Sequence, residues 1–154
     1  MSPRSRTLAL VALLVAAAGP VSAAPPRTAR GAERELLVEN PERGTVLRVR
    51  LQPGEIFSVV YHHSIYDQPV TEDFVLDEDG RIVLRAVTSP SAAVREYFGI
   101  TSAGERHAMA RTMTEIVFRI ATGTAQRLRA GGVERSFLEL GEHGDRLVLR
   151  AHPP

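Results

Sequence analysis

Short segments in which apolar and polar residues alternate, each ended by turn-forming residues, run through most of this 154-residue chain. In Thr45–Leu51, every second residue from Leu47 onward is apolar, and arginines stand between them. Because successive side chains of a strand point to opposite faces, this period of two predicts strands with one buried face. Turn signals recur about every 8–12 residues, a spacing typical of sandwiches and barrels. We therefore predict a mainly β chain: a single-domain antiparallel β-sandwich or small barrel of about eight strands.

The segments differ in how clearly they predict a strand. The clearest pair flanks Asp77–Gly80, where Asp-Gly supplies a hairpin turn. Thr112–Ile120 fits both a strand and a helical stripe, and its content of Thr, Ile, Val and Phe favours a strand. Ser89–Ala110 is the least regular stretch, with a short helical turn expected near Ala93–Tyr97. The expected strands are Glu35–Glu39, Thr45–Leu51, Ile56–Ile65, Thr71–Leu76, Arg81–Thr88, Thr112–Ile120, Arg135–Leu140 and Asp145–Ala151.

The first 23 residues have the features of a Sec signal peptide. Arg4 and Arg6 precede the apolar run Leu8–Ala18, and Val21–Ala23 offers small residues at the positions that signal peptidase requires. The apolar run would form a helix of about 16 Å, roughly half the thickness of a bilayer core, so a membrane span is not expected. We predict a periplasmic or secreted protein, with a signal peptide over residues 1–23, a flexible leader over 24–31 and one β domain over 32–154.

Composition excludes several kinds of chemistry. The chain has no cysteine and, among its 19 basic residues, no lysine. Disulfides, zinc–thiolate sites, cysteine nucleophiles, P-loops and lysine Schiff bases are therefore all excluded. Removal of residues 1–23 takes away two arginines and leaves 17 basic against 18 acidic side chains. Because this balance is near neutral and no tryptophan is present for base stacking, a nucleic-acid partner is not expected.

The densest polar stretch of the chain is Tyr61–Phe74, which contains two of the five histidines, a serine and three carboxylates. His63 shares a strand face with apolar neighbours, so it is expected to point inward and to need a hydrogen-bond partner. Glu72 follows the turn at Pro69 on the apolar face of the next strand, and an antiparallel return predicts a His63–Glu72 hydrogen bond. The residues of this motif, structural or ligand-binding, are Tyr61, His63, Ser64, Pro69, Val70 and Glu72.

The same stretch carries a resemblance to a known family. The matching residues are Phe57, Tyr61, His63, Ser64, Pro69, Val70, Glu72 and Gly80, followed by Ile82–Leu84. This pattern resembles the bacterial domain-of-unknown-function family 1850. The resemblance implies a small exported β-domain, and such proteins are often encoded beside TRAP-type solute transporters. It therefore implies a periplasmic accessory role, with a transporter subunit or a solute-binding protein as partner, and it supplies no activity.

Two functions are compatible with the sequence. The first is an exported non-catalytic accessory or binding protein, associated with a TRAP-type solute transporter and without a cofactor. The alternative is a small hydrolase or metal-binding protein centred on His63, Ser64 and Glu72. Adjacent strand residues point to opposite faces, so His63 and Ser64 are not expected to form a catalytic dyad in a regular strand. A metal site would need a third ligand besides His63 and Glu72, and the sequence assigns none.

The processing site gives a first testable prediction. Because Val21–Ala23 meets the small-residue requirement of signal peptidase, the exported protein should begin at Ala24 or Pro25. N-terminal sequencing of the protein recovered from the periplasm or the medium measures this directly. An intact Met1 on membrane-bound protein would contradict the prediction and would indicate an anchored chain instead.

Overall fold

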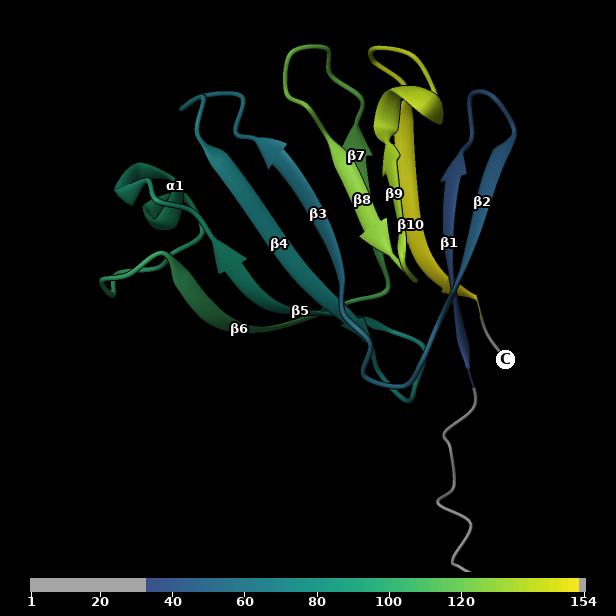
Figure 1. Cartoon of the computed structure of the whole chain (residues 1–154), viewed down its shortest axis with the longest axis horizontal. Helices are drawn as coiled ribbons and strands as arrows, with labels where there is room; N and C mark the ends of the chain where they lie inside the picture. Colours follow the sequence, from purple (N-terminus) through teal and green to yellow (C-terminus); the bar gives the residue numbers. More distant parts are fainter. Residues whose placement is uncertain (1–32, 153–154) are drawn as a thin grey trace, which may run out of the picture.

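The alternating segments form the strands of two antiparallel sheets that pack face to face (Figure 1). The structure is a computed structural model and describes residues 33–152; the predicted signal peptide and leader lie outside this range. One sheet has the order β2 (Thr45–Leu51), β1 (Arg34–Asn40), β10 (Arg146–His152) and β7 (Glu115–Arg119). The other has the order β6 (Arg106–Met113), β5 (Ile82–Thr88), β4 (Pro69–Leu76), β3 (Phe57–His62), β8 (Arg127–Ala130) and β9 (Val133–Ser136). The prediction of a mainly β antiparallel sandwich is confirmed, and the described residues form no closed barrel.

Two short helical elements interrupt the strands. The helix α1 (Ala92–Tyr97) lies between β5 and β6, where the sequence predicts a helical turn. The Ser91 side chain caps its start by accepting a hydrogen bond from the Val94 N–H. The 3-10 helix η1 (Phe137–Glu139) follows β9 and begins with a capping box. Within residues 33–152, no helix is long and apolar enough to cross a membrane.

The inner faces of the two sheets meet in one apolar core. Phe57 on β3 and Phe74 on β4 are cross-strand partners, and their buried rings stack with centroids 5.3 Å apart. The four-stranded sheet contributes buried side chains such as Leu36 and Leu149, and α1 contributes Val94. Full burial of one such side chain is worth about 1.5–3 kcal/mol relative to leaving it in water. The core is therefore what holds the two sheets together.

Some strands in the first two thirds of the domain differ from the sequence prediction. Strand β3 ends at His62 rather than Ile65, because the chain then turns: the His63 carbonyl accepts the Asp67 N–H at 2.7 Å and the His63 N–H donates to Gln68 O at 2.8 Å. The predicted strand Thr112–Ile120 is two strands, since β6 ends and β7 begins on either side of Thr114, in different sheets. The described residues contain ten strands rather than about eight.

The C-terminal part of the domain differs most from its prediction. The sequence predicts that Arg135–Leu140 pairs with Asp145–Ala151, whereas β10 pairs with β1 and β7. Arg135 and Ser136 instead belong to β9, which pairs with β8 in a hairpin. Gly131 and Gly132 form the turn of this hairpin, and both have a positive φ. Phe137 then leaves the strand and is buried in the core at the start of η1. Burial of this ring decides where β9 ends.

A buried asparagine connects two turns of the sandwich. Asn40 ends β1, and its Nδ2 donates to Leu140 O at 3.0 Å and to Asp145 Oδ2 at 3.1 Å. Its Oδ1 accepts the backbone N–H groups of Glu42 and Arg43. Because both polar atoms are paired, burying this side chain carries little penalty. Hydrogen bonds from the Glu142 N–H, from Asn40 and from Arg43 lower the pKa of Asp145 to about 2, so the Asp145 carboxylate stays ionised at neutral pH.

We predict that Gly141→Ala destabilises the domain more than Gly80→Ala does. A Cβ on Gly141 would lie 2.2 Å from Asn40 Nδ2 and 2.8 Å from Ile120 Cδ1, so buried atoms must move. Gly80, in the Asp-Gly turn, has a φ of +71° and a nearest neighbour at 3.9 Å, so alanine there meets only backbone strain of about 1 kcal/mol. In urea unfolding we expect a loss of about 2–3 kcal/mol for Gly141→Ala. Equal losses would contradict the steric reason.

Candidate functional site

The predicted motif spans the end of β3, a tight loop and the start of β4. Tyr61 lies in β3 opposite Val70 of β4, and Val70 is buried in the core. Pro69 is the first residue of β4, a position that tolerates a missing N–H. Glu72 lies further along β4, and Ser64 is exposed in the loop. These residues share one corner of the six-stranded sheet, but they face different surroundings.

The loop is closed by the backbone of His63, the first residue after β3. Its N–H donates to Gln68 O at 2.8 Å, and its carbonyl accepts the Asp67 N–H at 2.7 Å. Asp67 takes a φ of +48°, a left-handed conformation that aspartate adopts more readily than most residues. The His63 side chain is only 6% exposed, and its Nδ1 accepts the Ile65 N–H at 3.3 Å. The imidazole is therefore held by its own loop.

An exposed apolar surface surrounds the His63 imidazole; we call it the aromatic patch and define it as Ile65, Tyr66 and Tyr97. The ring centroids of Tyr66 and Tyr97 lie 5.0 and 4.7 Å from that of His63. The exposed fractions are 71% for Ile65, 40% for Tyr66 and 62% for Tyr97. Tyr97 is the last residue of α1, and the ring of Phe98 packs against it at 5.5 Å. The loop and the helix thus present two tyrosines packed on one buried histidine.

A second polar group of this corner lies on the inner face of the sheet. Glu72 is the cross-strand neighbour of Val59 and Val87, both fully buried, so its side chain points between the sheets. The Tyr61 hydroxyl donates to Glu72 Oε1 at 2.7 Å. The Tyr61 ring in turn packs edge-on against Phe118 of β7, with centroids 6.4 Å apart. Tyr61 therefore holds the Glu72 carboxyl group of the six-stranded sheet and also contacts Phe118 of the four-stranded sheet.

Burial changes the acidity of both members of the pair. It raises the pKa of Glu72 above the ordinary value of 4.5, while the Tyr61 hydroxyl and the charge of Arg111 act in the opposite direction. Burial, and next the negative charge of Glu72, raise the pKa of Tyr61 well above its usual range. The hydroxyl is therefore the donor at physiological pH. The carboxyl group takes up a proton more readily than an exposed glutamate does.

The predicted His63–Glu72 hydrogen bond is wrong. Glu72 accepts from Tyr61, and the His63 ring bonds to the backbone of its own loop. His63 is buried as expected, but the register of β3 and β4 places Glu72 opposite Val59, four residues from His63, so the antiparallel return does not bring the two side chains together. Ser64 is exposed, and the hydrogen bond to His63 Nδ1 comes from the Ile65 N–H. Among residues 33–152, no three His, Asp or Glu side chains are grouped as metal ligands would be.

Sequence reasoning missed two contributors to this end of the domain. Tyr97 reaches the motif only through tertiary packing of α1, for which the sequence has no local signal. Ser102 Oγ lies 3.0 Å from His107 Nδ1, and His107 Nε2 donates to Gly104 O at 2.8 Å. Both nitrogens of this buried histidine are therefore engaged, and they fix the loop that precedes β6.

These features define a small antiparallel β-sandwich with an exposed aromatic patch and an inward tyrosine–glutamate pair. Comparisons of the chain with family models, with curated proteins and with solved structures found no match. The fold class therefore follows from the structure, and the resemblance to family 1850 stays a prediction.

We predict that Glu72→Gln stabilises the domain at neutral pH. Because the pKa of Glu72 is higher in the folded than in the unfolded chain, the folded state binds this proton more tightly. The stabilisation that the protonated Glu72 gives to the folded state is complete below 4.5, its pKa in the unfolded chain, and it is lost as the pH rises through its pKa in the folded chain. Glutamine keeps an acceptor for Tyr61 without the buried charge. Melting temperatures should therefore show a gain for the variant that grows from about pH 4 to about pH 8.

A matched control is Glu78→Gln, which removes the same charge from an exposed position in the Asp77–Gly80 turn. This control should show no gain that grows with pH. If Glu72→Gln shifts the melting temperature equally at every pH, burial of the carboxylate is not the cause.

Proposed function

We propose that this chain is an exported, non-catalytic binding protein and that the aromatic patch is where it contacts a protein partner. The observation that carries the proposal is the grouping of exposed apolar side chains. Ile65, Tyr66 and Tyr97 are three of the eight large apolar side chains exposed on the described surface, and the two tyrosines pack on one histidine. Grouped apolar side chains at a surface mark interaction sites, whereas scattered ones do not.

The patch also has the chemistry of a binding surface. Tyrosine combines an apolar ring with a polar tip, and it is enriched among the residues that dominate interface energies. Tyr97 stands at the end of a helix, while Ile65 and Tyr66 belong to a loop closed by two backbone hydrogen bonds. The buried imidazole supports both rings from below. Less conformational freedom is lost when such a preformed surface binds a partner.

A hydrolase or metal site at the same corner has less support. Ser64 is exposed, while Nδ1 of His63 accepts the Ile65 N–H, so the serine and the imidazole do not form a nucleophile–base pair. Glu72 points between the sheets and accepts from Tyr61. The three side chains named for the catalytic alternative therefore do not converge, and this geometry favours a binding role.

The partner that we propose is the solute-binding protein of a TRAP-type transporter from the same organism. This choice rests on the resemblance to family 1850 over Phe57–Leu84, whose residues include the loop that carries Ile65 and Tyr66. A subunit of the same transporter is the second choice. Either partner would meet the exported domain on the outer side of the membrane.

We predict that the mature protein binds this solute-binding protein in calorimetric titration and that Tyr97→Ala weakens the binding by roughly thirtyfold. Truncation of a central interface aromatic typically costs about 2 kcal/mol or more. Ile65→Ser should act in the same direction. The control is Val117→Ser on the four-stranded sheet, where a side chain 50% exposed lies outside the patch, and its affinity should equal that of the wild type.

Melting temperatures show whether each of these variants is folded. Equal affinities of folded Tyr97→Ala and wild-type protein would reject the patch as the contact surface. Absence of binding by the wild type to the solute-binding protein and to the transporter subunits would reject the proposed partner.

A further inference from the structure

The outer face of the six-stranded sheet carries more arginines than acids. Along β8, the side chain of Leu128 is fully buried, so the arginines on either side of it point outward. The same alternation places Ser58 of β3 and Asp73 of β4 outward, with a hydrogen bond of 2.6 Å between them. The charged residues of this surface, which we call the arginine face, are Arg85, Arg106, Arg127, Arg129, Glu55, Asp73 and Glu134.

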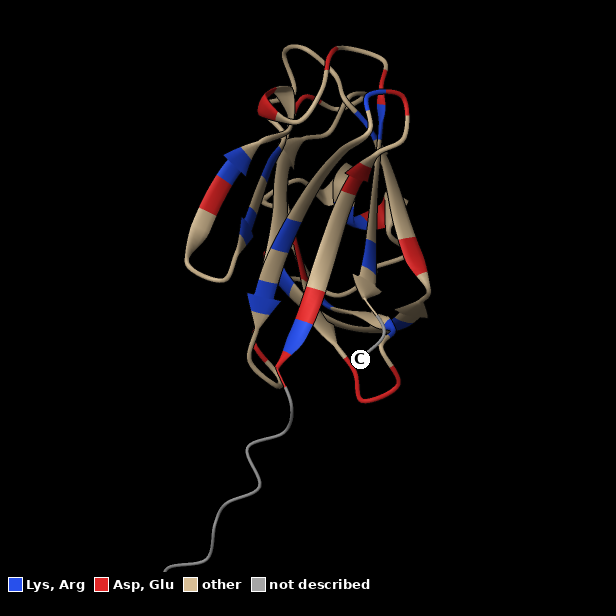
Figure 2. Ribbon diagram, turned by 90° about the vertical axis from the view of Figure 1, so that its right-hand side faces the viewer, with Lys and Arg blue, Asp and Glu red and all other residues tan. Residues whose placement is uncertain are grey.

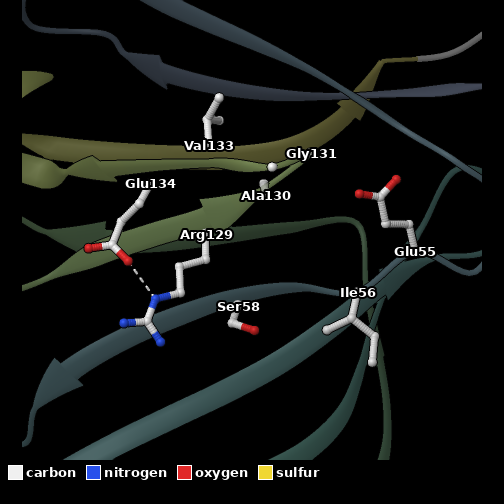
Figure 3. A pocket seen from close by; sticks show the side chains of 9 residues that line it. Glu55, Ile56, Ser58, Arg129, Ala130, Gly131, Val133 and Glu134 are labelled. Carbon is white, nitrogen blue, oxygen red and sulfur yellow. Dashed lines mark hydrogen bonds and ion pairs between the residues drawn. The ribbon is translucent and has the colours of Figure 1, made fainter.

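The three acids of the arginine face leave guanidinium groups available. Glu134 accepts a hydrogen bond from Arg127 Nη1 at 2.8 Å and another from Arg129 Nε at 2.6 Å. One carboxylate is thus shared by two guanidiniums, while Asp73 pairs with Arg106. Arg85 has no ion-pair partner within residues 33–152. Glu55 accepts the Gln52 N–H at 2.7 Å and, within residues 33–152, pairs with no arginine. Four arginines therefore stand against three acids, which leaves one positive charge in excess, and Arg129 bonds to Glu134 through Nε (Figure 3).

The four-stranded sheet does not share this feature. On its outer face the ion pairs join one arginine to one glutamate, as in Arg48–Glu35 at 2.8 Å and Arg150–Glu39 at 2.6 Å. Figure 2 looks onto this sheet and shows basic and acidic positions next to one another. The sharing of one acid by two arginines is thus a property of the arginine face.

Two open depressions on the arginine face share Ile56, whose side chain is 51% exposed. One has a volume of about 320 Å³ and contains Arg129 and Ser58 in its lining; Figure 3 shows the guanidinium on one side of Ser58 and Ile56 on the other. The other has a volume of about 460 Å³ and is lined by Arg85 and Arg106. Small-molecule sites enclose most of their ligand, so depressions this open suit an extended chain better.

We propose that the arginine face binds an acidic, extended segment of a protein partner, with carboxylates on the arginines and an apolar side chain on Ile56. A guanidinium matches a carboxylate in bidentate geometry, and arginine is enriched at protein interfaces. The positive excess supplies charge complementarity to an acidic segment. Ile56 adds apolar area that a simple anion would not use. This surface shares no residue with the aromatic patch and stands independently of the function proposed for that patch.

The test uses a short peptide of alternating glutamate and leucine, titrated into the isotope-labelled mature protein at low salt and followed by NMR. Backbone amides of β3 and β8 should shift, and the affinity should fall as salt is added. Arg129→Gln and Arg85→Gln should each weaken binding by about tenfold, and Ile56→Ser should also weaken it. The matched control is Arg50→Gln, the same change at an exposed position of β2 in the other sheet, which should leave binding unchanged.

Several results would overturn the proposal. These are absence of binding at about 1 mM peptide, equal affinity of the folded Arg129→Gln variant, or equal binding of the same peptide with glutamine in place of glutamate. Inorganic phosphate at matched ionic strength distinguishes a peptide site from a simple anion site. Full displacement of the peptide by phosphate, with no effect of Ile56→Ser, would mean that the arginines bind small anions only. Preferred binding of a DNA oligonucleotide would likewise replace the proposed partner by a nucleic acid.

Discussion

Burial of apolar side chains between two sheets of unequal width governs the architecture of this domain. Neighbouring strands lie about 4.8 Å apart, so four strands cannot cover the inner face of six. Helix α1 and the residues after it supply the missing cover, because Val94, Phe98 and Ile100 pack into the same core as the sheets. Figure 1 accordingly shows α1 beside β4, β5 and β6, away from β1 and β2. Without this cover, the inner side chains of β5 would face water.

The same cover creates the candidate site. Because α1 must lie over the wider sheet, its last residue, Tyr97, reaches the loop between β3 and β4 and meets His63. The tyrosine ring then packs on an imidazole at the surface instead of entering the core. Further inward, the carboxyl group of Glu72 is tolerated between the sheets because Tyr61 donates to it. One helix thus both completes the core and contributes Tyr97 to the exposed aromatic patch.

The sequence predicts the strands and turns that local residue patterns determine, and it does not predict the contacts that depend on strand register or tertiary packing. The period of two places most strands, and the Asp-Gly turn places Gly80 at a φ of +71°. The β8–β9 hairpin is missed because its strands have four residues each, too few for an alternation to stand out. The His63–Glu72 prediction fails because it depends on the register of β3 and β4, which the tight loop sets so that Glu72 lies opposite Val59. Tyr97 cannot be assigned to the site at all, since only tertiary packing brings it there.

The pairing of the first strand with the last sets the order in which the domain can fold. Leu36 of β1 and Ala151 of β10 are cross-strand partners, although nearly all the described residues lie between them. Strands β3, β4 and β5 pair with neighbours in sequence and can assemble early, whereas the β1–β2 hairpin keeps one open edge until β10 arrives. A chain that is made from its N-terminus therefore holds this strand edge unpaired until β10 has been made. During that interval the edge is exposed to aggregation and to chaperones.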